Sequence, residues 1–179
     1  MFKNIGIVVL VTLAILIVTM GFLKFLQKKS VDSVNHPNVQ AFLKMIRYAE
    51  GTAGPNGYRT MFTGLLFDNA YADHPRQRNC AGTLCSTAAG AYQFLSSTWD
   101  YVALRLSLKD FSPANQDLAA TELIREKGAL NDVIAGNFAT AVTKVNRVWA
   151  SLPGSPYGQP TKTLAQLTSV YQNEGGSFA

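Results

Sequence analysis

One carboxylic acid in this sequence stands where its pKa should be raised. Glu50 ends the apolar stretch MIRYAE, and Gly51 follows it directly. The last turn of a helix presents unpaired carbonyls and the negative end of the helix dipole, which disfavours a nearby anion by about 0.3–1 kcal/mol. Apolar neighbours add desolvation, so both effects raise the pKa of Glu50. A carboxyl that stays protonated near neutral pH suits a general acid acting on a glycosidic oxygen, but a water-facing carboxylate at a helix end fits the same pattern.

Two later segments contain side chains suited to binding a sugar. The first, STAAGAYQF over residues 86–94, combines small residues that let a ligand approach the backbone with an aromatic ring and an amide, Tyr92 and Gln93. The second, WASLPGSPYGQP over residues 149–160, is a Gly- and Pro-rich loop that would present Tyr157 and Gln159. Ligand sites combine apolar faces with a few placed polar groups. Each segment taken alone is equally typical of a tight structural loop.

The sequence gives little support for other kinds of catalytic or binding site. The sequence lacks the phosphate-binding, dinucleotide-binding and zinc-protease motifs, and it lacks the nucleophile elbow of serine hydrolases. Its only histidines are His36 and His74, and a lone His in the polar DHP loop is more typical of a structural residue. Cys80 and Cys85 are separated by four residues, which matches neither a zinc site nor a redox C-x-x-C motif. We therefore expect no metal and no cofactor.

The two cysteines suit a short-loop disulfide. In an oxidising compartment, a bond between Cys80 and Cys85 would restrict the unfolded chain by roughly 2 kcal/mol. In the cytoplasm both would remain free thiols. We favour the disulfide.

The N-terminus predicts a membrane anchor followed by one domain. Residues 5–23 carry no charge and are flanked by Lys3 on one side and by three lysines, Lys24, Lys28 and Lys29, on the other. About 20 apolar residues span a bilayer as a helix, whereas a cleaved signal peptide has an apolar region of about 7–15 residues. We expect an uncleaved signal-anchor over 1–29, a linker over 30–37 and a single domain over 38–179.

The net charge of +5 belongs mostly to that anchor. Four of the 16 basic residues flank it, and the remaining 12 nearly balance the 11 acidic residues. A domain with so little excess charge lacks the basic surface that nucleic-acid binding requires. We therefore expect no nucleic-acid partner.

The hydrophobic pattern predicts a mostly helical domain. Apolar residues recur at helical spacing from Val39 to Ala49. Residues 54–70 are punctuated by Gly and Asn and alternate in a way that favours a small hairpin or irregular β region, and 71–90 follow as a long loop. Helices are then expected from Ser97, where Asp100 completes a capping pattern, from Ser112–Pro113 to Gly128, over about 129–135, from Asn137 to Pro153–Gly154, and over about 162–173. This order of elements indicates an α+β fold.

Taken in order, five segments resemble the lambda-type phage lysozymes, a family of endolysins that are lytic transglycosylases of the lysozyme-like superfamily. The segments are FLKMIRYAEGT, GYRTMFTGLLFDNAYADHPR, STAAGAYQFLSSTWD, LSLKDFSPANQDLAATELIREKGAL and VWASLPGSPYGQ. Together they extend over about residues 39–176. The resemblance implies a lysozyme-like fold and a monomeric catalytic domain.

The resemblance makes Glu50 the single catalytic acid and base. The family cleaves the β-1,4 bond between N-acetylmuramic acid and N-acetylglucosamine and leaves a 1,6-anhydro ring. The implied partner is therefore the glycan strand of peptidoglycan. Matched positions place Tyr92, Gln93 and Tyr157 along the cleft, and further substrate-binding candidates are Ser86, Thr87, Gly90 and Gln159.

Three features depart from the family pattern. They are the N-terminal anchor, the cysteine pair, and Arg59, which stands where the lambda enzyme has an acid. Asp68 and Asp73 therefore stay candidates for a second acid if the reaction is hydrolytic. The alternatives are a hydrolytic muramidase of the same fold and a non-catalytic, wall-binding virion membrane protein.

The anchor and the implied activity together predict the localisation. We expect a single-pass membrane protein whose catalytic domain lies on the periplasmic or wall side, in the host inner membrane or in a virion's internal membrane. The three lysines that follow the anchor favour the opposite orientation, because positive charge tends to stay in the cytoplasm.

Overall fold

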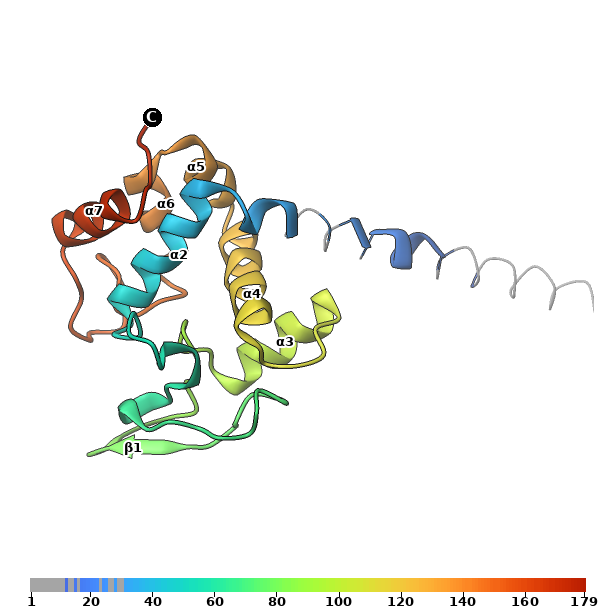
Figure 1. Ribbon diagram of the computed structural model, residues 1–179, viewed down its shortest axis with the longest axis horizontal. Coiled ribbons are helices and arrows are strands. Elements are labelled where there is room, and N and C mark those ends of the chain that lie inside the picture. Colours follow the sequence, from blue (N-terminus) through green and yellow to red (C-terminus); the bar gives the residue numbers. More distant parts are fainter. Residues whose placement is uncertain (1–11, 13–14, 16, 23, 26–27, 29–30) are drawn as a thin grey trace, which may run out of the picture.

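The computed structural model describes residues 12, 15, 17–22, 24–25, 28 and 31–179. Helices pack around α2, while the two short strands and the 3-10 helices lie together at one end of the molecule (Figure 1). The elements, labelled as in Figure 1, are α2 (Pro37–Ala49), the 3-10 helices η1 (Gly57–Arg59) and η2 (Phe62–Gly64), β1 (Asn79–Ala81), β2 (Leu84–Ser86), α3 (Ser96–Leu106), α4 (Pro113–Glu126), α5 (Leu130–Ala135), α6 (Phe138–Val145) and α7 (Leu164–Asn173).

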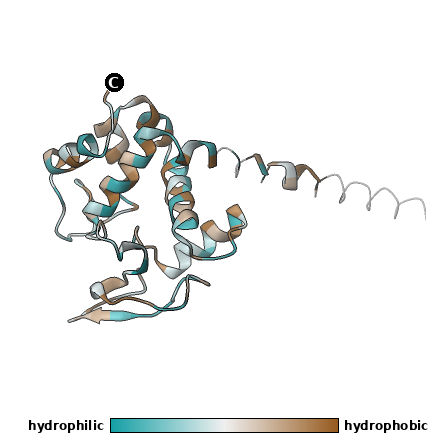
Figure 2. Ribbon diagram, in the orientation of Figure 1, coloured by the Kyte–Doolittle hydropathy of each residue, from teal (hydrophilic) through white to brown (hydrophobic). Residues whose placement is uncertain are grey.

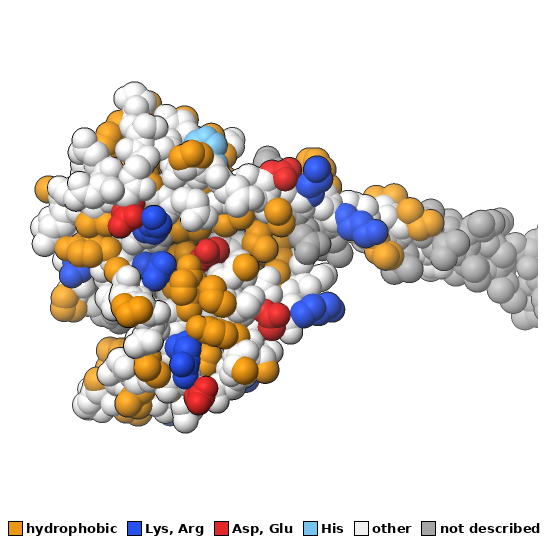
Figure 3. Space-filling model, viewed as in Figure 1, with side chains coloured by type: hydrophobic (Ala, Val, Ile, Leu, Met, Phe, Trp, Pro, Cys, Tyr) orange, Lys and Arg blue, Asp and Glu red, His pale blue; other side chains and the backbone are white. Residues whose placement is uncertain are grey.

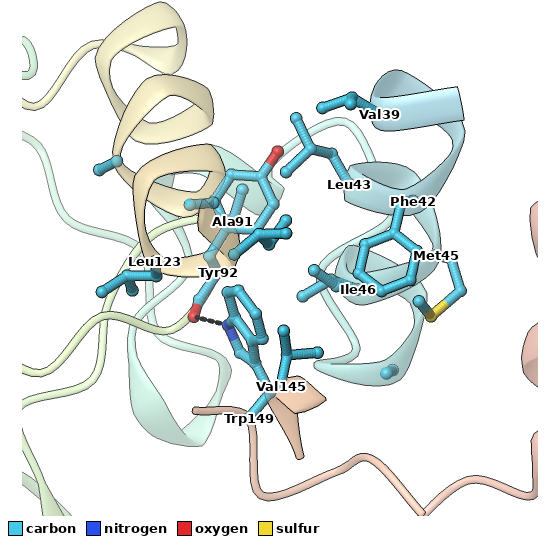
Figure 4. Close-up of a cluster of buried hydrophobic side chains, with 14 of the residues drawn as sticks. Val39, Phe42, Leu43, Met45, Ile46, Ala91, Tyr92, Leu123, Val145 and Trp149 are labelled. Carbon is cyan, nitrogen blue, oxygen red and sulfur yellow. Dashed lines mark hydrogen bonds between the residues drawn. The ribbon is translucent and has the colours of Figure 1, made fainter. Parts of the chain in front are cut away.

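Helix α2 is the centre of the helical body. Its apolar positions repeat every three or four residues, so a broad face is buried against α4, α5 and α7. Figure 2 shows this mixture of hydrophobic and hydrophilic residues along the helices. In the core, Leu43 and Ile46 face Tyr92 and Trp149 (Figure 4). Both α2 side chains are at most 1% exposed, and burying a side chain of this size contributes about 1.5–3 kcal/mol. The core therefore fixes the helix that ends just before Glu50.

The β structure lies only partly where the sequence pattern placed it. Residues 54–70 contain the two 3-10 helices and an isolated antiparallel bridge between Thr60 and Leu66, so of the two predicted alternatives they form the irregular β region and not the hairpin. Thr63 has φ 78°, and this left-handed residue turns the chain before a ladder can extend. The sheet is instead formed by β1 and β2, inside the segment predicted to be a long loop. Each strand has three residues, too few for an alternating pattern to be recognised.

The two cysteines join the strands of this small sheet. Cys80 lies opposite Cys85 in the antiparallel register, and the two form a disulfide with sulfur atoms 2.00 Å apart. Gly82 has φ 60° in the turn between the strands, a conformation that glycine adopts without strain. The disulfide therefore links β1 to β2. Residues of β2 also line the cleft that contains Glu50.

The later helices follow the predicted order with shifted ends. α4 begins at Pro113 as predicted, because proline lacks the N–H that the first turn leaves unpaired. α3 begins at Ser96 without a side-chain cap, so the cap predicted at Ser97 and Asp100 is wrong. α6 ends at Val145, well before its predicted end, yet Trp149 beyond it is only 3% exposed. The loop that follows α6 is thus held to the core by an indole ring rather than by a helix.

An aromatic cluster joins the β end of the molecule to the helices. Phe111, which precedes α4, is fully buried and packs against Phe67, Phe94 and Trp99 at ring-centroid distances of 4.6–6.2 Å. Such pairs contribute about 0.5–1.5 kcal/mol each beyond the burial of their area. The cluster holds loop 88–95, which contains Phe94, in a fixed position beside the helices.

The predicted membrane-spanning helix falls largely outside the described residues. Of the stretch 5–23, the structure describes residues 12, 15 and 17–22, and these are helical. Across all residues that the structure describes, no helix is both long enough and apolar enough to pass through a bilayer.

Candidate active site

Glu50 follows the last residue of α2 and is held there by a glycine-dependent turn. Its backbone N–H donates to Ile46 O at 2.9 Å and so continues the helical pattern. Gly51 then adopts φ 73°, the left-handed conformation that commonly ends a helix. The N–H of Thr52 donates back to Arg47 O at 2.8 Å. The helix therefore stops abruptly, with the Glu50 side chain at its negative end.

Thr52 couples this helix end to loop 88–95. Its hydroxyl, on a side chain that is 2% exposed, donates to Ala91 O at 2.5 Å. From another direction, Trp149 Nε1 donates to Tyr92 O at 3.1 Å (Figure 4). Because both bonds are buried, breaking either would leave an unsatisfied polar group at a cost of about 1–3 kcal/mol. The loop is therefore fixed relative to Glu50.

The carboxyl of Glu50 is buried and contacts a hydroxyl from a distant loop. Ser151 Oγ donates to Glu50 Oε1 at 2.5 Å. Burial raises the pKa of Glu50, while hydrogen bonds from the side chain and backbone of Ser151 lower it, and the pKa remains raised overall. This is the direction that the sequence predicted, with desolvation as the larger cause. Sequence reasoning missed Ser151, although it lies in the segment 149–160 that was selected for Tyr157 and Gln159.

Glu50 lies in a cleft of about 670 Å³, a size typical of ligand sites. The end of α2, η2, β2, loop 88–95, the end of α4 and residues 147–160 contribute to its lining. Of the described residues that line the cleft, Glu50 alone has a carboxyl group. The other polar side chains in the lining are Ser86, Tyr92, Gln93, Thr98, Lys127, Arg147, Ser151, Tyr157 and Gln159.

Four of the predicted substrate-binding residues line this cleft with accessible side chains: Ser86, Gln93, Tyr157 and Gln159. The Gln93 amide is already oriented, because its Nε2 donates to Thr60 O and Gly90 O at 3.0 Å each. Tyr157 is 55% exposed, and its hydroxyl donates to Arg147 O at 2.8 Å. That bond fixes the ring beside the cleft while leaving a face open to a ligand.

Tyr92 differs from the expectation that it offers a stacking face. Its side chain is only 2% exposed, and its hydroxyl donates to Asp117 Oδ1 at 2.6 Å. Tyr58 donates to the same oxygen at 2.9 Å. Burial raises the pKa of Asp117, although the hydroxyls of Tyr92 and Tyr58 and the charge of Arg47 act to lower it. Tyr92 is thus part of a buried polar network behind the cleft.

Two predicted residues do not reach the cleft. Thr87 Oγ1 lies 3.2 Å from Ser96 Oγ and accepts from Ser96 N at 3.1 Å, so its side chain is engaged by the first residue of α3. Gly90 has φ 78°, and a Cβ placed there would lie 2.3 Å from Gln116 Oε1. Packing and backbone conformation therefore account for glycine at position 90.

The candidates for a second acid also lie outside the cleft. Asp68 pairs with Arg59 at 3.2 Å. Burial acts to raise the pKa of Asp73, but hydrogen bonds from Arg76, His74 and Trp99 lower it overall. Both carboxylates are thus engaged in surface and loop structure. Within the part of the chain that the structure describes, no three His, Cys, Asp or Glu side chains gather to hold a metal ion.

Comparison with known proteins identifies the family. The family model described as Endolysin matches residues 40–178, which is most of the domain. The chain belongs to the endolysin family. The endolysin of Escherichia phage P2 is 40% identical over 157 residues, covering 79% of this chain and 94% of the relative. The endolysin of Escherichia phage lambda is 39% identical over 145 residues, covering 77% of this chain and 91% of the relative.

The fold comparison agrees with the sequence comparison. A structure of bacteriophage lambda lysozyme complexed with a chitohexasaccharide superposes with a TM-score of 0.76 at 37% identity, covering 80% of this endolysin and 97% of the lambda chain. A shorter match, 39% identical over 88 residues, is to the probable transglycosylase SceD of Staphylococcus aureus, covering 44% of this chain and 38% of the relative. The predicted family and lysozyme-like fold are confirmed, and degradation of peptidoglycan is supported as the activity.

The comparisons correct the predicted localisation. Nearly the whole length of the P2 and lambda endolysins aligns with about four-fifths of this chain. In the described residues there is also no helix able to cross a membrane. The prediction of a single-pass membrane protein, in the host inner membrane or a virion membrane, is therefore wrong. Its membrane part had rested on the apolar composition of residues 5–23 and the lysines that flank them, and its wall side had rested on the implied activity.

Proposed function

We propose that this endolysin is a lytic transglycosylase that cleaves the β-1,4 bond between N-acetylmuramic acid and N-acetylglucosamine. The observation that carries the proposal is the isolation of Glu50: among the described residues it is the single carboxyl in the cleft, and its pKa is raised by burial. Hydrolytic glycosidases ordinarily use two carboxyls, about 5–5.5 Å apart in retaining enzymes and about 6.5–9.5 Å apart in inverting ones. A cleft with one carboxyl favours a reaction in which the substrate supplies its own nucleophile.

In the first step Glu50 acts as an acid. Its protonated carboxyl gives the proton to the glycosidic oxygen, the bond from that oxygen to C1 of muramic acid breaks, and N-acetylglucosamine leaves as an alcohol. The raised pKa keeps the proton on Glu50 until it is needed. The hydrogen bond from Ser151 then stabilises the carboxylate that forms.

In the second step Glu50 acts as a base. Its carboxylate takes the proton from the 6-hydroxyl of the same muramic acid, whose oxygen bonds to C1 and closes a 1,6-anhydro ring. Glu50 ends the cycle protonated, and no water is consumed. A second protein carboxylate is not required, because a well-oriented intramolecular hydroxyl has an effective concentration of up to about 10⁵–10⁸ M. The partial match to a protein named a probable transglycosylase also supports this chemistry.

The products of digestion test the proposal. Purified peptidoglycan is digested with the full-length protein, and the released muropeptides are weighed by mass spectrometry before and after borohydride treatment. We expect products lighter by one water than ordinary reducing-end fragments, with ends that borohydride does not reduce. Reducing ends would instead indicate a hydrolytic muramidase of the same fold.

A matched variant tests the role of Glu50. Glu50→Gln keeps the shape and removes the acid, so we expect cleavage to fall by at least about 10²–10⁴-fold while the far-UV circular dichroism spectrum is unchanged. Retained cleavage would exclude Glu50 as the acid. Absence of cleavage by a folded wild-type protein, combined with binding to peptidoglycan, would indicate a wall-binding module.

A further inference from the structure

Two basic side chains in the cleft form no ion pair with any residue that the structure describes. Lys127 follows α4 and Arg147 follows α6, and both are exposed side chains that line the cleft. Several other basic residues of the domain pair with carboxylates, as Arg105 and Arg125 do with the buried Glu122 at 2.7 and 2.6 Å. Within the described part of the chain, neither Lys127 nor Arg147 forms such a pair. Their charges are therefore available to a ligand.

The backbone of Arg147 is tied to the segment 149–160 that follows it. Its carbonyl oxygen accepts from the Tyr157 hydroxyl at 2.8 Å, which ties the start of the loop to its exposed aromatic residue. A planar guanidinium so placed can accept a carboxylate through two parallel hydrogen bonds. Lys127 adds a second positive charge to the lining of the same cleft.

The charge of the cleft differs from that of the domain. Basic and acidic residues nearly balance after the N-terminal lysines are set aside, and Figure 3 shows both kinds interspersed on one face. The described lining contains two cations and one acid, Glu50, which is the group that must start protonated. The cleft is thus a positively charged site on a nearly neutral domain, and such a site attracts anions.

The remaining lining is suited to the sugars. Phe62, Leu84 and Leu95 contribute apolar surface from the β end of the molecule, and Leu84 and Leu95 are each 48% exposed. N-acetyl sugars carry no charge, so nothing in the bare disaccharide requires a cation. The anions of this substrate class are the carboxylates of the peptide stem that is attached to the lactyl group of muramic acid.

We propose that Arg147 and Lys127 bind carboxylates of the peptide stem and make this endolysin selective for glycan that bears acidic stems. This inference rests on the proposed function, because it names the part of the substrate that the same cleft recognises. The residues act on substrate binding and not on the proton of Glu50, whose pKa is set by its burial and by its two hydrogen bonds from Ser151. Selectivity and chemistry can therefore be separated by experiment.

Soluble glycan strands of one length are prepared in three forms to test the proposal. The first carries acidic stems, the second carries the same stems with carboxyls converted to amides, and the third has its stems removed and exposes the lactyl carboxylate. For the wild-type protein we expect kcat/KM to be about fivefold higher on acidic stems than on amidated stems, an advantage that shrinks as NaCl is raised. In Arg147→Gln and Lys127→Gln that ratio should fall toward one.

Two control variants sharpen the comparison. Arg147→Lys keeps the charge and should retain most of the preference. Lys109→Gln removes an exposed cation that does not line the cleft, and it should leave the ratio at the wild-type value. These controls separate a specific contact from a general change in net charge.

Two results would overturn the inference. One is an unchanged ratio in Arg147→Gln and Lys127→Gln, which includes the case of an equal loss on acidic and amidated stems. A loss on the stem-free glycan as large as the loss on acidic stems would assign the cations to the lactyl carboxylate instead. Failure of the wild-type protein to cleave any of the three forms would contradict the proposed function itself and is distinguishable from all of these.

Discussion

Ser151 Oγ donates to Glu50 Oε1 at 2.5 Å and so joins two residues that are 101 positions apart in the chain. Two opposing influences act on the pKa of this carboxyl, and the hydrogen bond is one of them. Burial disfavours the anion and raises the pKa of Glu50, whereas Ser151 favours the anion and lowers it. The balance leaves an acid whose protonated form is favoured and which yet has a donor ready for its conjugate base. A residue that must give a proton and then take one requires both properties.

Removing the Ser151 hydroxyl should shift the pH profile of the enzyme. In Ser151→Ala the anion loses a hydrogen bond, so the pKa of Glu50 rises further. Because Glu50 must be protonated to act as an acid, the alkaline limb of the kcat/KM profile should move to higher pH. We also expect kcat to fall by about tenfold, since the carboxyl loses the contact that orients it. Ser169→Ala, an exposed hydroxyl on α7, serves as the control. An alkaline limb that stays in place or moves to lower pH would contradict this role.

The raised pKa of Glu50 also predicts a pH-dependent gain in stability when the acid is removed. An acid whose folded pKa lies above its unfolded value, 4.5, contributes stability below that value and loses it as pH rises through the folded pKa. Glutamine is neutral at every pH, so its contribution to stability does not change with pH. The difference in unfolding free energy, Glu50→Gln minus wild type, should therefore grow from pH 4 to pH 8 in urea titrations. A difference that is constant or that shrinks with pH would show that burial does not penalise the Glu50 anion.

Local sequence signals predicted the place of Glu50 at the end of a helix, because that place depends on neighbours in the chain. The apolar spacing of α2 and Gly51 directly after Glu50 define the helix end, and both are visible without the fold. The exposure of the Tyr92 ring was predicted wrongly. The ring is buried in a network with Asp117 and Tyr58, residues that are distant in the sequence and meet only in the fold. The same limit applies to Ser151, Lys127 and Arg147, which reach the cleft only through packing of the helices.

The predictions for the position of the sheet and for the N-terminal segment failed for different reasons. Three-residue strands carry no readable alternation, and the disulfide that joins them is a contact between side chains rather than a periodic signal. For residues 5–23, composition alone indicated a membrane span, and composition does not establish how a protein is localised. The fold class could nonetheless be predicted, because the order of long amphipathic helices is a robust signal.

His74 should make the domain less stable in mild acid. Its side chain is 2% exposed, with Nε2 2.9 Å from Phe94 O and Nδ1 accepting from Arg76 N at 3.0 Å. Burial lowers its pKa and the charge of Arg76 adds to this, while the Phe94 carbonyl, Asp73 and Asp100 oppose it.

The sign of the resulting pH dependence follows from linkage. A histidine with a lowered folded pKa contributes stability above its unfolded value, 6.5, and loses it as pH falls through the folded pKa. Between pH 7 and pH 5, His74 should therefore lower the wild-type Tm, while the raised pKa of Glu50 acts in the opposite direction. His74→Gln should be destabilised by about 2 kcal/mol at pH 7, and this difference from the wild-type protein should shrink as pH falls to 5. Parallel curves for the two proteins would exclude His74 as the source.

A pair of glycine variants tests whether Gly90 is needed for packing. Both Gly90 and Gly128 have positive φ, 78° and 68°, so alanine introduces backbone strain of about 1–2 kcal/mol at either site. At Gly128 the new methyl meets nothing within 4 Å, whereas at Gly90 it would lie 2.3 Å from Gln116 Oε1 and 2.7 Å from the Phe111 ring. Gly90→Ala must therefore also displace Gln116, whose amide oxygen accepts from Ala91 N at 2.8 Å.

The two variants should differ strongly in unfolding free energy, although their backbone strain is similar. We expect Gly128→Ala to lower the unfolding free energy by about 1–2 kcal/mol and Gly90→Ala to lower it by more than about 4 kcal/mol, measured by urea titration. Because Gln116 fixes loop 88–95 beside Glu50, Gly90→Ala should also reduce kcat/KM under conditions where the variant is fully folded. Equal destabilisation of the two variants would show that loop 88–95 adapts to the added methyl, and unchanged catalysis would show that its position does not matter to Glu50.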